Sequence, residues 1–249
     1  MVKSLLWLLL AFITFCSSAK SQDVVHFVAE DLPPYHYVNE LGEPDGALVE
    51  LARAVASQAG INAVVEIMPM ARVLHEFETK TNVALLSWLK TPARAANFRF
   101  LGTMAHAEAS LIGLTTLNKP ITTLAEAKAY RTGTIRGYYS EQFLKQHGFN
   151  EGYELVLVSD HERLWQLLYK GRIDFVFTNS LSLQKELHTL SLDAEKIEQK
   201  LVLTRFPNEL ALAVNSHFSE PLAARIEAAL KTLASDGTQQ QILTRWRVQ

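Results

Sequence analysis

Short apolar runs alternate with helical patterns along the first third of the chain. Residues 24–29, 62–68 and 82–87 form apolar runs of the kind found in strands that are covered on both faces. Apolar positions recur at helical spacing over 47–59, and a further helix is expected over 71–79. Strands that alternate with helices in this way form a mostly parallel sheet with helices on both faces.

The same alternation resumes in the middle of the chain. The expected elements there are strands at 131–135, 154–158, 173–177 and 201–204, with helices at 124–129 and 159–170. Apolar stretches at 106–115 and 209–214 are interpreted as passages of the chain into a second α/β lobe and back. Helices over 220–234 and 238–246 then return to the first lobe.

The pattern therefore predicts an α/β protein of two lobes with a two-strand hinge. Lobe 1 is expected to be discontinuous and to contain residues 22–115 and 212–249, while lobe 2 contains residues 116–211. Residues 1–21 are left out of both lobes, because they have the layout of a secretory signal peptide.

That leader begins with the positive charge of Lys3 and continues with an apolar run from Leu5 to Phe15. The run is shorter than a membrane-spanning helix requires. Small residues follow, so cleavage after Ala19 or after Ser21 satisfies the small-x-small rule. The mature chain is expected to be exported.

Cys16 is the one cysteine of the sequence, and it lies in this leader. Lipidated cysteines usually follow a small residue, whereas Phe15 is bulky, which argues against lipoprotein anchoring through Cys16. Removal of the leader leaves no thiol or disulfide chemistry. It also removes Lys3 and Lys20, which changes the formal charge from −2 to −4. A slightly acidic chain indicates neither nucleic acid nor an anionic membrane as a partner.

The segment 82–101 contains the strongest candidate chemistry. Ser87 and Trp88 stand at the carboxyl end of a predicted buried strand, where open α/β sheets place their ligands. The Thr91-Pro92 pair ends that strand, and Arg94 follows on what is expected to be a single helical turn. A guanidinium at this place offers a rigid two-pronged donor to a carboxylate.

The sequence Thr91-Pro92-Ala93-Arg94, followed by Phe98-Arg99-Phe100, resembles the bacterial extracellular solute-binding proteins of family 3, the polar amino-acid type. Pro33-Pro34-Tyr35 with Gly46 is similar to the opening of the same family, and Pro69-Met70-Ala71-Arg72 to a Pro-Trp-x-Arg variant of one branch. The resemblance implies a periplasmic-binding-protein-like fold of type II in the periplasm. It also implies that Arg94 grips a carboxylate, with Tyr35 and Arg72 as further ligand-binding candidates.

The second lobe supplies its candidates at Arg136-Gly137-Tyr138-Tyr139, just before a predicted helix start near Ser140. A glycine turn at a helix N-terminus exposes backbone amides that suit an anion. The family has a similar pair here, followed by a short helix that contacts the ligand from the second lobe, so Arg136, Gly137, Tyr138 and Tyr139 become ligand-binding candidates. The alternative interpretation is that Gly137 only forms a turn and that the segment makes no contact with a ligand.

Asn179 marks a departure from the family pattern. Many amino-acid binders place an aspartate there to pair with the α-ammonium, and asparagine cannot offset a charge. Leu86 and Leu89 likewise stand where serines often assist the ligand. An unpaired ammonium in a closed cleft is costly. The expected ligand is therefore a small carboxylate-bearing solute, an amino acid or a related molecule, and need not be an ordinary α-amino acid.

The leading interpretation is a solute-binding protein that passes its ligand to an ABC-type membrane transporter. A sensor module of the same fold, which reports to a membrane receptor, is one alternative. A cyclohexadienyl-dehydratase-like enzyme is another, with Glu108 and Asp31 as the nearest acids. The sequence has no serine-hydrolase, zinc-protease or phosphate-loop motif. No catalytic residue, metal or cofactor is expected, and a clamp that must open is expected to be a monomer.

Overall fold

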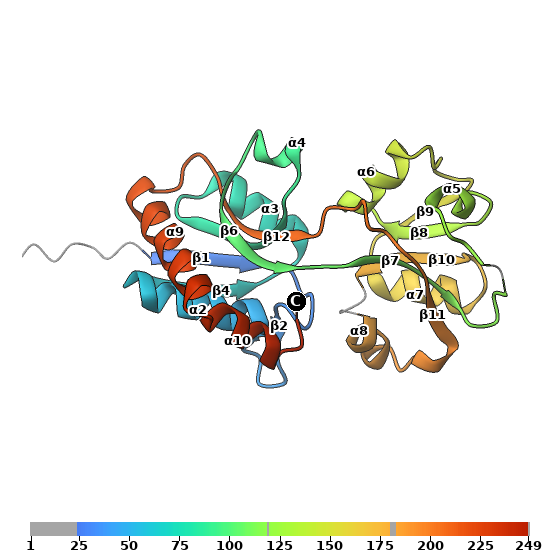
Figure 1. Cartoon of the computed structure of the whole chain (residues 1–249), viewed down its shortest axis with the longest axis horizontal. Coiled ribbons are helices and arrows are strands. Elements are labelled where there is room, and N and C mark those ends of the chain that lie inside the picture. The colour runs from blue at the N-terminus through green and yellow to red at the C-terminus, as the bar shows by residue number, and fades with distance from the viewer. Residues whose placement is uncertain (1–23, 119, 180–182, 249) are drawn as a thin grey trace, which may run out of the picture.

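The computed structural model describes residues 24–118, 120–179 and 183–248, arranged as α/β lobes that lie side by side (Figure 1). The predicted signal peptide, with Cys16 and the expected cleavage points, lies outside the described residues. The two-lobed architecture with mostly parallel sheets, predicted from the alternation of apolar runs, is confirmed.

The sheet of lobe 1 has the strand order β4-β1-β5-β12-β6. In it, β1 (Val24–Ala29) lies between β4 (Asn62–Ile67) and β5 (Val83–Leu89) and pairs parallel with both. The last strand to join, β12 (Glu209–Val214), runs antiparallel to β5 and to β6 (Arg99–His106). Helical connections make the first three strands parallel, whereas β12 arrives from the other lobe.

Helices cover both faces of this sheet. On one face, α2 (Ala47–Ala59), α9 (Glu220–Ser235) and α10 (Thr238–Arg245) enclose the larger core. On the other face, α3 (Met70–Thr79) packs against a smaller core. Because both faces are covered, successive residues of β1 such as Phe27 and Val28 are buried in different cores, and no polar alternation appears. A short hairpin, β2 (Tyr37–Val38) and β3 (Pro44–Asp45), precedes α2.

The sheet of lobe 2 has the order β11-β7-β10-β8-β9. Its parallel strands are β8 (Thr132–Ile135), β9 (Leu155–Val158) and β10 (Phe175–Asn179). Antiparallel pairing joins β10 to β7 (Ala109–Leu114) and β7 to β11 (Ile197–Val202). The carboxyl ends of the parallel strands therefore share one edge of the sheet.

Helices cover both faces of lobe 2 as well. On one face, α5 (Leu124–Ala127) and α6 (Tyr139–Gln146) pack over an aromatic-rich core. On the other face lie α7 (His161–Tyr169), α8 (Leu183–Thr189) and the 3-10 turn η1 (Ala194–Lys196). Lobe 1 also carries the single turn α4 (Pro92–Ala95), between β5 and β6.

The chain crosses between the lobes along neighbouring segments, which Figure 1 shows as a long green ribbon from β6 to β7 and an orange return from β11 to β12. The backbone N–H of Ala107 donates to the carbonyl of Asn208 at 2.8 Å, and that of Leu203 donates to Ala109 at the same distance. These bonds pair the outgoing and returning chain and form the two-strand hinge.

The lobe boundaries predicted from sequence need correction. Ala109–Leu114, expected in lobe 1, forms β7 within the sheet of lobe 2. Residues 209–211, expected in lobe 2, belong to β12 in the sheet of lobe 1. The apolar stretch 106–115 contains two strands joined at Ala107–Glu108, and no turn-forming residue marks their division in the sequence.

Strand ends also differ from the predictions. The strand predicted at 82–87 continues to Leu89, and the one predicted at 173–177 is shifted to Phe175–Asn179. The strand predicted at 201–204 is Ile197–Val202. This strand lies at the edge of its sheet and exposes Glu198 and Gln199. The strand is therefore polar at these positions, and the apolar pattern in the sequence indicates only its C-terminal end.

Candidate functional site

A cavity of about 180 Å³ lies between the lobes. Lobe 1 lines it with residues from the carboxyl ends of β1 and β5 and from α3 and α4, while lobe 2 contributes the start of α6, the start of α7 and the end of β10. An engineered protein cavity of about 150 Å³ holds benzene. The interlobe cavity therefore has room for a small organic molecule.

Arg94 enters this cavity from α4. Thr91 caps that turn by accepting the backbone N–H of Arg94 at 3.2 Å, and Pro92 occupies a position where its missing amide hydrogen costs nothing. The Arg94 Nη1 donates to the carbonyl of Leu89 at 3.1 Å. Its guanidinium carbon stacks 3.6 Å from the centre of a ring of Trp88 and lies 5.7 Å from that of Tyr139 in lobe 2.

Burial lowers the pKa of Arg94 to about 10, an effect that Tyr139 partly opposes. The guanidinium thus stays charged at neutral pH. Among the residues that the structure describes, no carboxylate lies within ion-pair distance of it. A partly buried cation without a counter-charge is costly until an anion joins it. The arrangement can therefore hold an anionic group between Trp88 and Tyr139.

Ser87 lines the cavity next to a buried histidine. His36 places Nδ1 2.6 Å from the carbonyl of Glu30 and Nε2 2.6 Å from the hydroxyl of Ser87. A carbonyl only accepts, so Nδ1 donates to it and, in the neutral ring, Nε2 accepts from Ser87. Burial lowers the pKa of His36 to about 4, which keeps the ring neutral. The Ser87 hydroxyl is thereby directed to His36.

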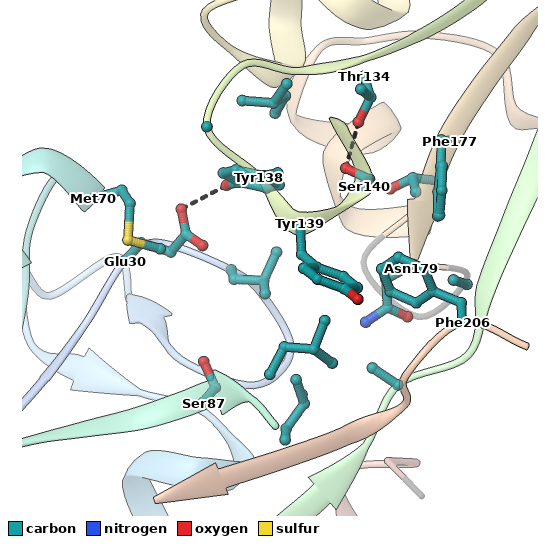
Figure 2. Close-up of a pocket in the computed structure, with 18 of the residues that line it drawn as sticks. Glu30, Met70, Ser87, Thr134, Tyr138, Tyr139, Ser140, Phe177, Asn179 and Phe206 are labelled. Atoms are coloured by element: carbon teal, nitrogen blue, oxygen red, sulfur yellow. Dashed lines mark hydrogen bonds between the residues drawn. The ribbon is translucent and has the colours of Figure 1, made fainter. Parts of the chain in front are cut away.

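Glu30 adds a carboxylate at the end of β1. Its Oε2 accepts a hydrogen bond of 2.6 Å from the hydroxyl of Tyr138 in lobe 2, drawn as a dashed line in Figure 2. Burial raises the pKa of Glu30, although the Tyr138 bond and His161 oppose that rise. His161 lines the same part of the cavity, and its Nδ1 lies 3.3 Å from Glu186. Burial lowers the pKa of His161, but the neighbouring carboxylates outweigh burial and raise it overall.

Tyr35 and Asn179 form a further contact between the lobes. Tyr35 is fully buried, and its hydroxyl accepts from the Asn179 side-chain amide at 3.0 Å while it donates to the carbonyl of His106 at 3.4 Å. Burial raises the pKa of Tyr35 to about 12. Asn179 lines the cavity, but Tyr35 lies behind it and does not.

The structure brings most of the predicted ligand-binding residues to this cavity. Those that line it are Ser87, Trp88, Arg94, Gly137, Tyr138, Tyr139 and Asn179. Arg136 lies outside it and pairs with Glu151 at 2.6 Å. Arg72 also lies outside, pairs with Glu76 at 2.9 Å and has a side chain 63% exposed, while Met70 of the same motif lines the cavity.

The backbone amide expected to bind an anion at Gly137 already has a partner. It donates at 2.7 Å to Oε2 of Glu141 in the first turn of α6, so this helix start supplies its own anion. Tyr138 and Tyr139 are half-buried, and both approach the other lobe.

Sequence reasoning missed Glu30 and His161 as site residues. Both stand where strands of a parallel sheet end, Glu30 directly after β1 and His161 three residues after β9, so the strand-end rule used for Ser87 applies to them equally. The acids proposed instead are less enclosed. Asp31 is exposed and outside the cavity, and Glu108 is exposed at its edge.

Within the described ranges, no group of three or more His, Cys, Asp or Glu side chains is placed to hold a metal ion. Among the described helices, none combines the length and the apolar character that a membrane span requires.

A cavity between hinged α/β lobes defines the architecture of periplasmic binding proteins. The model of the bacterial extracellular solute-binding proteins, family 3, matches residues 24–249, and the chain belongs to this family. A search of curated proteins found no significant match.

Solved structures share the fold at low sequence identity. An ancestral arginine-binding protein bound to arginine matches with a TM-score of 0.76 and 20% identity, over 90% of this chain and 97% of its own. A histidine kinase sensor domain with similarity to periplasmic binding proteins gives 0.76 and 20%, over 89% and 95%. An amino acid ABC transporter substrate-binding protein from Streptococcus pneumoniae, bound to L-arginine, gives 0.75 and 18%, over 91% and 95%.

Proposed function

We propose that this protein captures a small carboxylate-bearing solute, an amino acid or a related molecule, between its lobes. The observation that carries the proposal is the guanidinium of Arg94, which lines the cavity and meets no carboxylate among the described residues. A ligand carboxylate supplies the missing charge and accepts from the planar fork of donors.

The contacts around Arg94 support such a role. Its stacking on Trp88 and the bond to the Leu89 carbonyl fix the guanidinium on lobe 1, while Tyr139 approaches it from lobe 2. A ligand held here contacts both lobes, and contacts made from both sides stabilise the closed form. Ser87, Trp88 and the start of α6 complete the proposed binding surface.

We further propose that the protein is exported to the periplasm by its leader, works as a monomer and delivers its ligand to an ABC-type transporter. Family membership supports this reading, as does the similarity to a transporter substrate-binding protein. A sensory role is the second candidate, because a histidine kinase sensor domain has the same fold. Co-purification with a permease favours transport, and co-purification with a receptor kinase favours sensing.

Enzymatic turnover receives less support. The acids named as candidates for the dehydratase-like reading, Asp31 and Glu108, are exposed, and of these two only Glu108 lines the cavity. Incubation with prephenate-like substrates is expected to give no product.

The test is a thermal-shift screen of amino acids and organic acids, followed by calorimetry with the compounds that stabilise the protein. Arg94→Ala is expected to lower the affinity of a carboxylate ligand by about 10-fold to 100-fold, the usual cost of losing hydrogen bonds between charged groups. Arg72→Ala, outside the cavity, is the matched control and is expected to leave affinity unchanged. An Arg94→Ala variant with undiminished affinity would overturn the proposal.

A further inference from the structure

Glu30 offers to the cavity a carboxylate that has no lysine or arginine partner in the described part of the chain. It stands at the carboxyl end of β1 and accepts the Tyr138 hydroxyl at 2.6 Å. Among the described residues, no lysine or arginine forms an ion pair with it. Its nearest basic neighbour, His161, is engaged with Glu186 at 3.3 Å. A ligand cation is the group that this carboxylate lacks.

Arg94, in contrast, is a cation that has no carboxylate beside it among the described residues. Several polar side chains of the cavity wall are already paired with protein groups. Asn179 donates to Tyr35, and Ser87 donates to His36. The hydroxyls of Thr134 and Ser140 lie 2.6 Å apart and satisfy each other. Among the described residues no carboxylate forms an ion pair with Arg94, and Glu108, the other acid that lines the cavity, is exposed at its edge. A ligand ammonium placed beside a carboxylate on Arg94 would therefore have no buried anion next to it, which is costly in an enclosed site.

Adjacent tyrosines at the start of α6 separate these charges. Tyr138 reaches toward Glu30, whereas Tyr139 lies 5.7 Å from the Arg94 guanidinium and 5.5 Å from the ring of Phe206. Figure 2 shows Tyr138 directed toward Glu30 and Met70 and Tyr139 directed toward Asn179 and Phe206. Burial lowers the pKa of Arg94, and the group that opposes this shift is Tyr139.

Apolar side chains make up much of the remaining wall. They come from both lobes and include Leu32, Met70, Leu89, Ile135, Phe177 and Phe206. The cavity thus combines the Arg94 cation, the Glu30 carboxylate and many apolar side chains, and no described carboxylate forms an ion pair with Arg94.

We propose, on the basis of the function proposed above, that the ligand is a monocarboxylate whose amino or guanidino group lies at the far end of an apolar chain, and that its recognition requires no α-ammonium. Arg94 holds the carboxylate and Glu30 receives the distal cation, displacing or sharing the Tyr138 hydroxyl. The class comprises ω-amino and ω-guanidino carboxylic acids. An ordinary α-amino acid binds only with its α-ammonium unpaired.

A set of compounds on one carbon skeleton tests both parts of the proposal. Hexanoate has the carboxylate alone, 2-aminohexanoate adds the α-ammonium, 6-aminohexanoate adds the distal amine, and lysine has both. Shorter and longer skeletons are run in parallel, by calorimetry with the mature protein at neutral pH. The distal amine is expected to strengthen binding by about tenfold or more at the best chain length, whereas the α-amine gives no gain.

Two variants test whether Glu30 is the source of the affinity that the distal amine adds. In the parent protein 6-aminohexanoate is expected to bind more tightly than hexanoate, and Glu30→Gln is expected to reduce the ratio of these two affinities to about one. Tyr138→Phe retains the carboxylate and removes its competing donor, so the ratio is expected to be kept or increased. Equal loss of the ratio in both variants would instead indicate impaired closure and would overturn the role given to Glu30.

The outcomes separate this inference from the proposed function. If no carboxylate binds and Arg94→Ala changes nothing, the proposed function itself fails. If carboxylates bind through Arg94 but the α-amine gives a tenfold gain, or the distal amine gives none at any chain length, only the ligand class inferred here is wrong.

Discussion

The hydroxyl of Tyr138 in lobe 2 donates a 2.6 Å hydrogen bond to the carboxylate of Glu30 in lobe 1. This bond closes one side of the cavity, and the bond from Asn179 to Tyr35 spans the lobes at another point. Protein groups alone therefore stabilise the closed arrangement before any ligand contributes. These bonds already favour the closed arrangement over the open one, and ligand contacts shift the equilibrium further toward closure.

Tyr138→Phe is expected to open the unliganded protein. Loss of a hydrogen bond to a charged acceptor costs about 1.5–3 kcal/mol, which shifts the closure equilibrium by about tenfold or more. Small-angle scattering or fluorescence energy transfer between labels on the lobes measures the shift. Tyr153→Phe, at an exposed tyrosine, is the matched control. Identical scattering from both variants and the parent would contradict a closing role for this bond.

Arg94→Lys is expected to weaken carboxylate binding by about tenfold, although it preserves the charge. Lysine is a flexible point charge that cannot present a planar fork, and it cannot stack as closely on Trp88. Calorimetry measures the loss, and Arg72→Lys on the exposed side of α3 serves as the control. Full affinity in Arg94→Lys would show that charge alone, without geometry, accounts for the site.

Acidification is expected to destabilise the protein through His36. Its folded-state pKa is about 4, whereas the unfolded value is near 6.5, so the unfolded chain binds more protons between these pH values. Stability that is present above pH 6.5 is therefore lost as the pH falls toward 4, by about 3 kcal/mol in total.

Denaturant unfolding of the parent and of His36→Gln between pH 7 and pH 4 measures this contribution. The variant starts from a lower stability, because it loses contacts with Glu30 and Ser87, but it is expected to show a shallower decline. Parallel declines in the two proteins would mean that His36 does not titrate as described.

Gly46→Ala is expected to be strongly destabilising. Gly46 has φ of 121°, and an added Cβ would lie 2.6 Å from the backbone oxygen of Tyr35. Gly42→Ala is the matched control, since Gly42 also has positive φ but nothing within 4 Å of the added carbon. The control loses about 1 kcal/mol from backbone strain alone. Equal unfolding free energies for the two variants would show that the contact with the Tyr35 loop is unimportant.

The sequence predicts the architecture because both lobes are built from strands covered on two faces. Such strands read as continuous apolar runs, as in 83–86 and 175–177, and the helices between them have clear stripes. The division of the lobes is harder to predict. Ala107–Glu108 joins two strands that belong to different sheets, and an apolar sequence does not record which sheet a strand enters.

A site residue can be predicted from sequence when its type and its local segment indicate its chemistry. It is missed when its role depends on another residue that only the fold brings next to it. Arg94 follows from a strand end and a proline turn in its own segment. The role of Glu30 depends on Tyr138, which lies 108 positions away, and that of Gly137 depends on whether Glu141 turns back to its amide. Such pairings arise from the folded arrangement and cannot be found from local spacing.

The position of β12 has a consequence for how the chain acquires its structure during synthesis. This strand lies between β5 and β6, so the sheet of lobe 1 stays split until residue 214 has left the ribosome. All strands of the other sheet lie within 109–202 and emerge earlier. The inserted lobe can therefore fold as a unit while its host still waits for a missing central strand, which reverses the usual N-terminal-first order of domain folding.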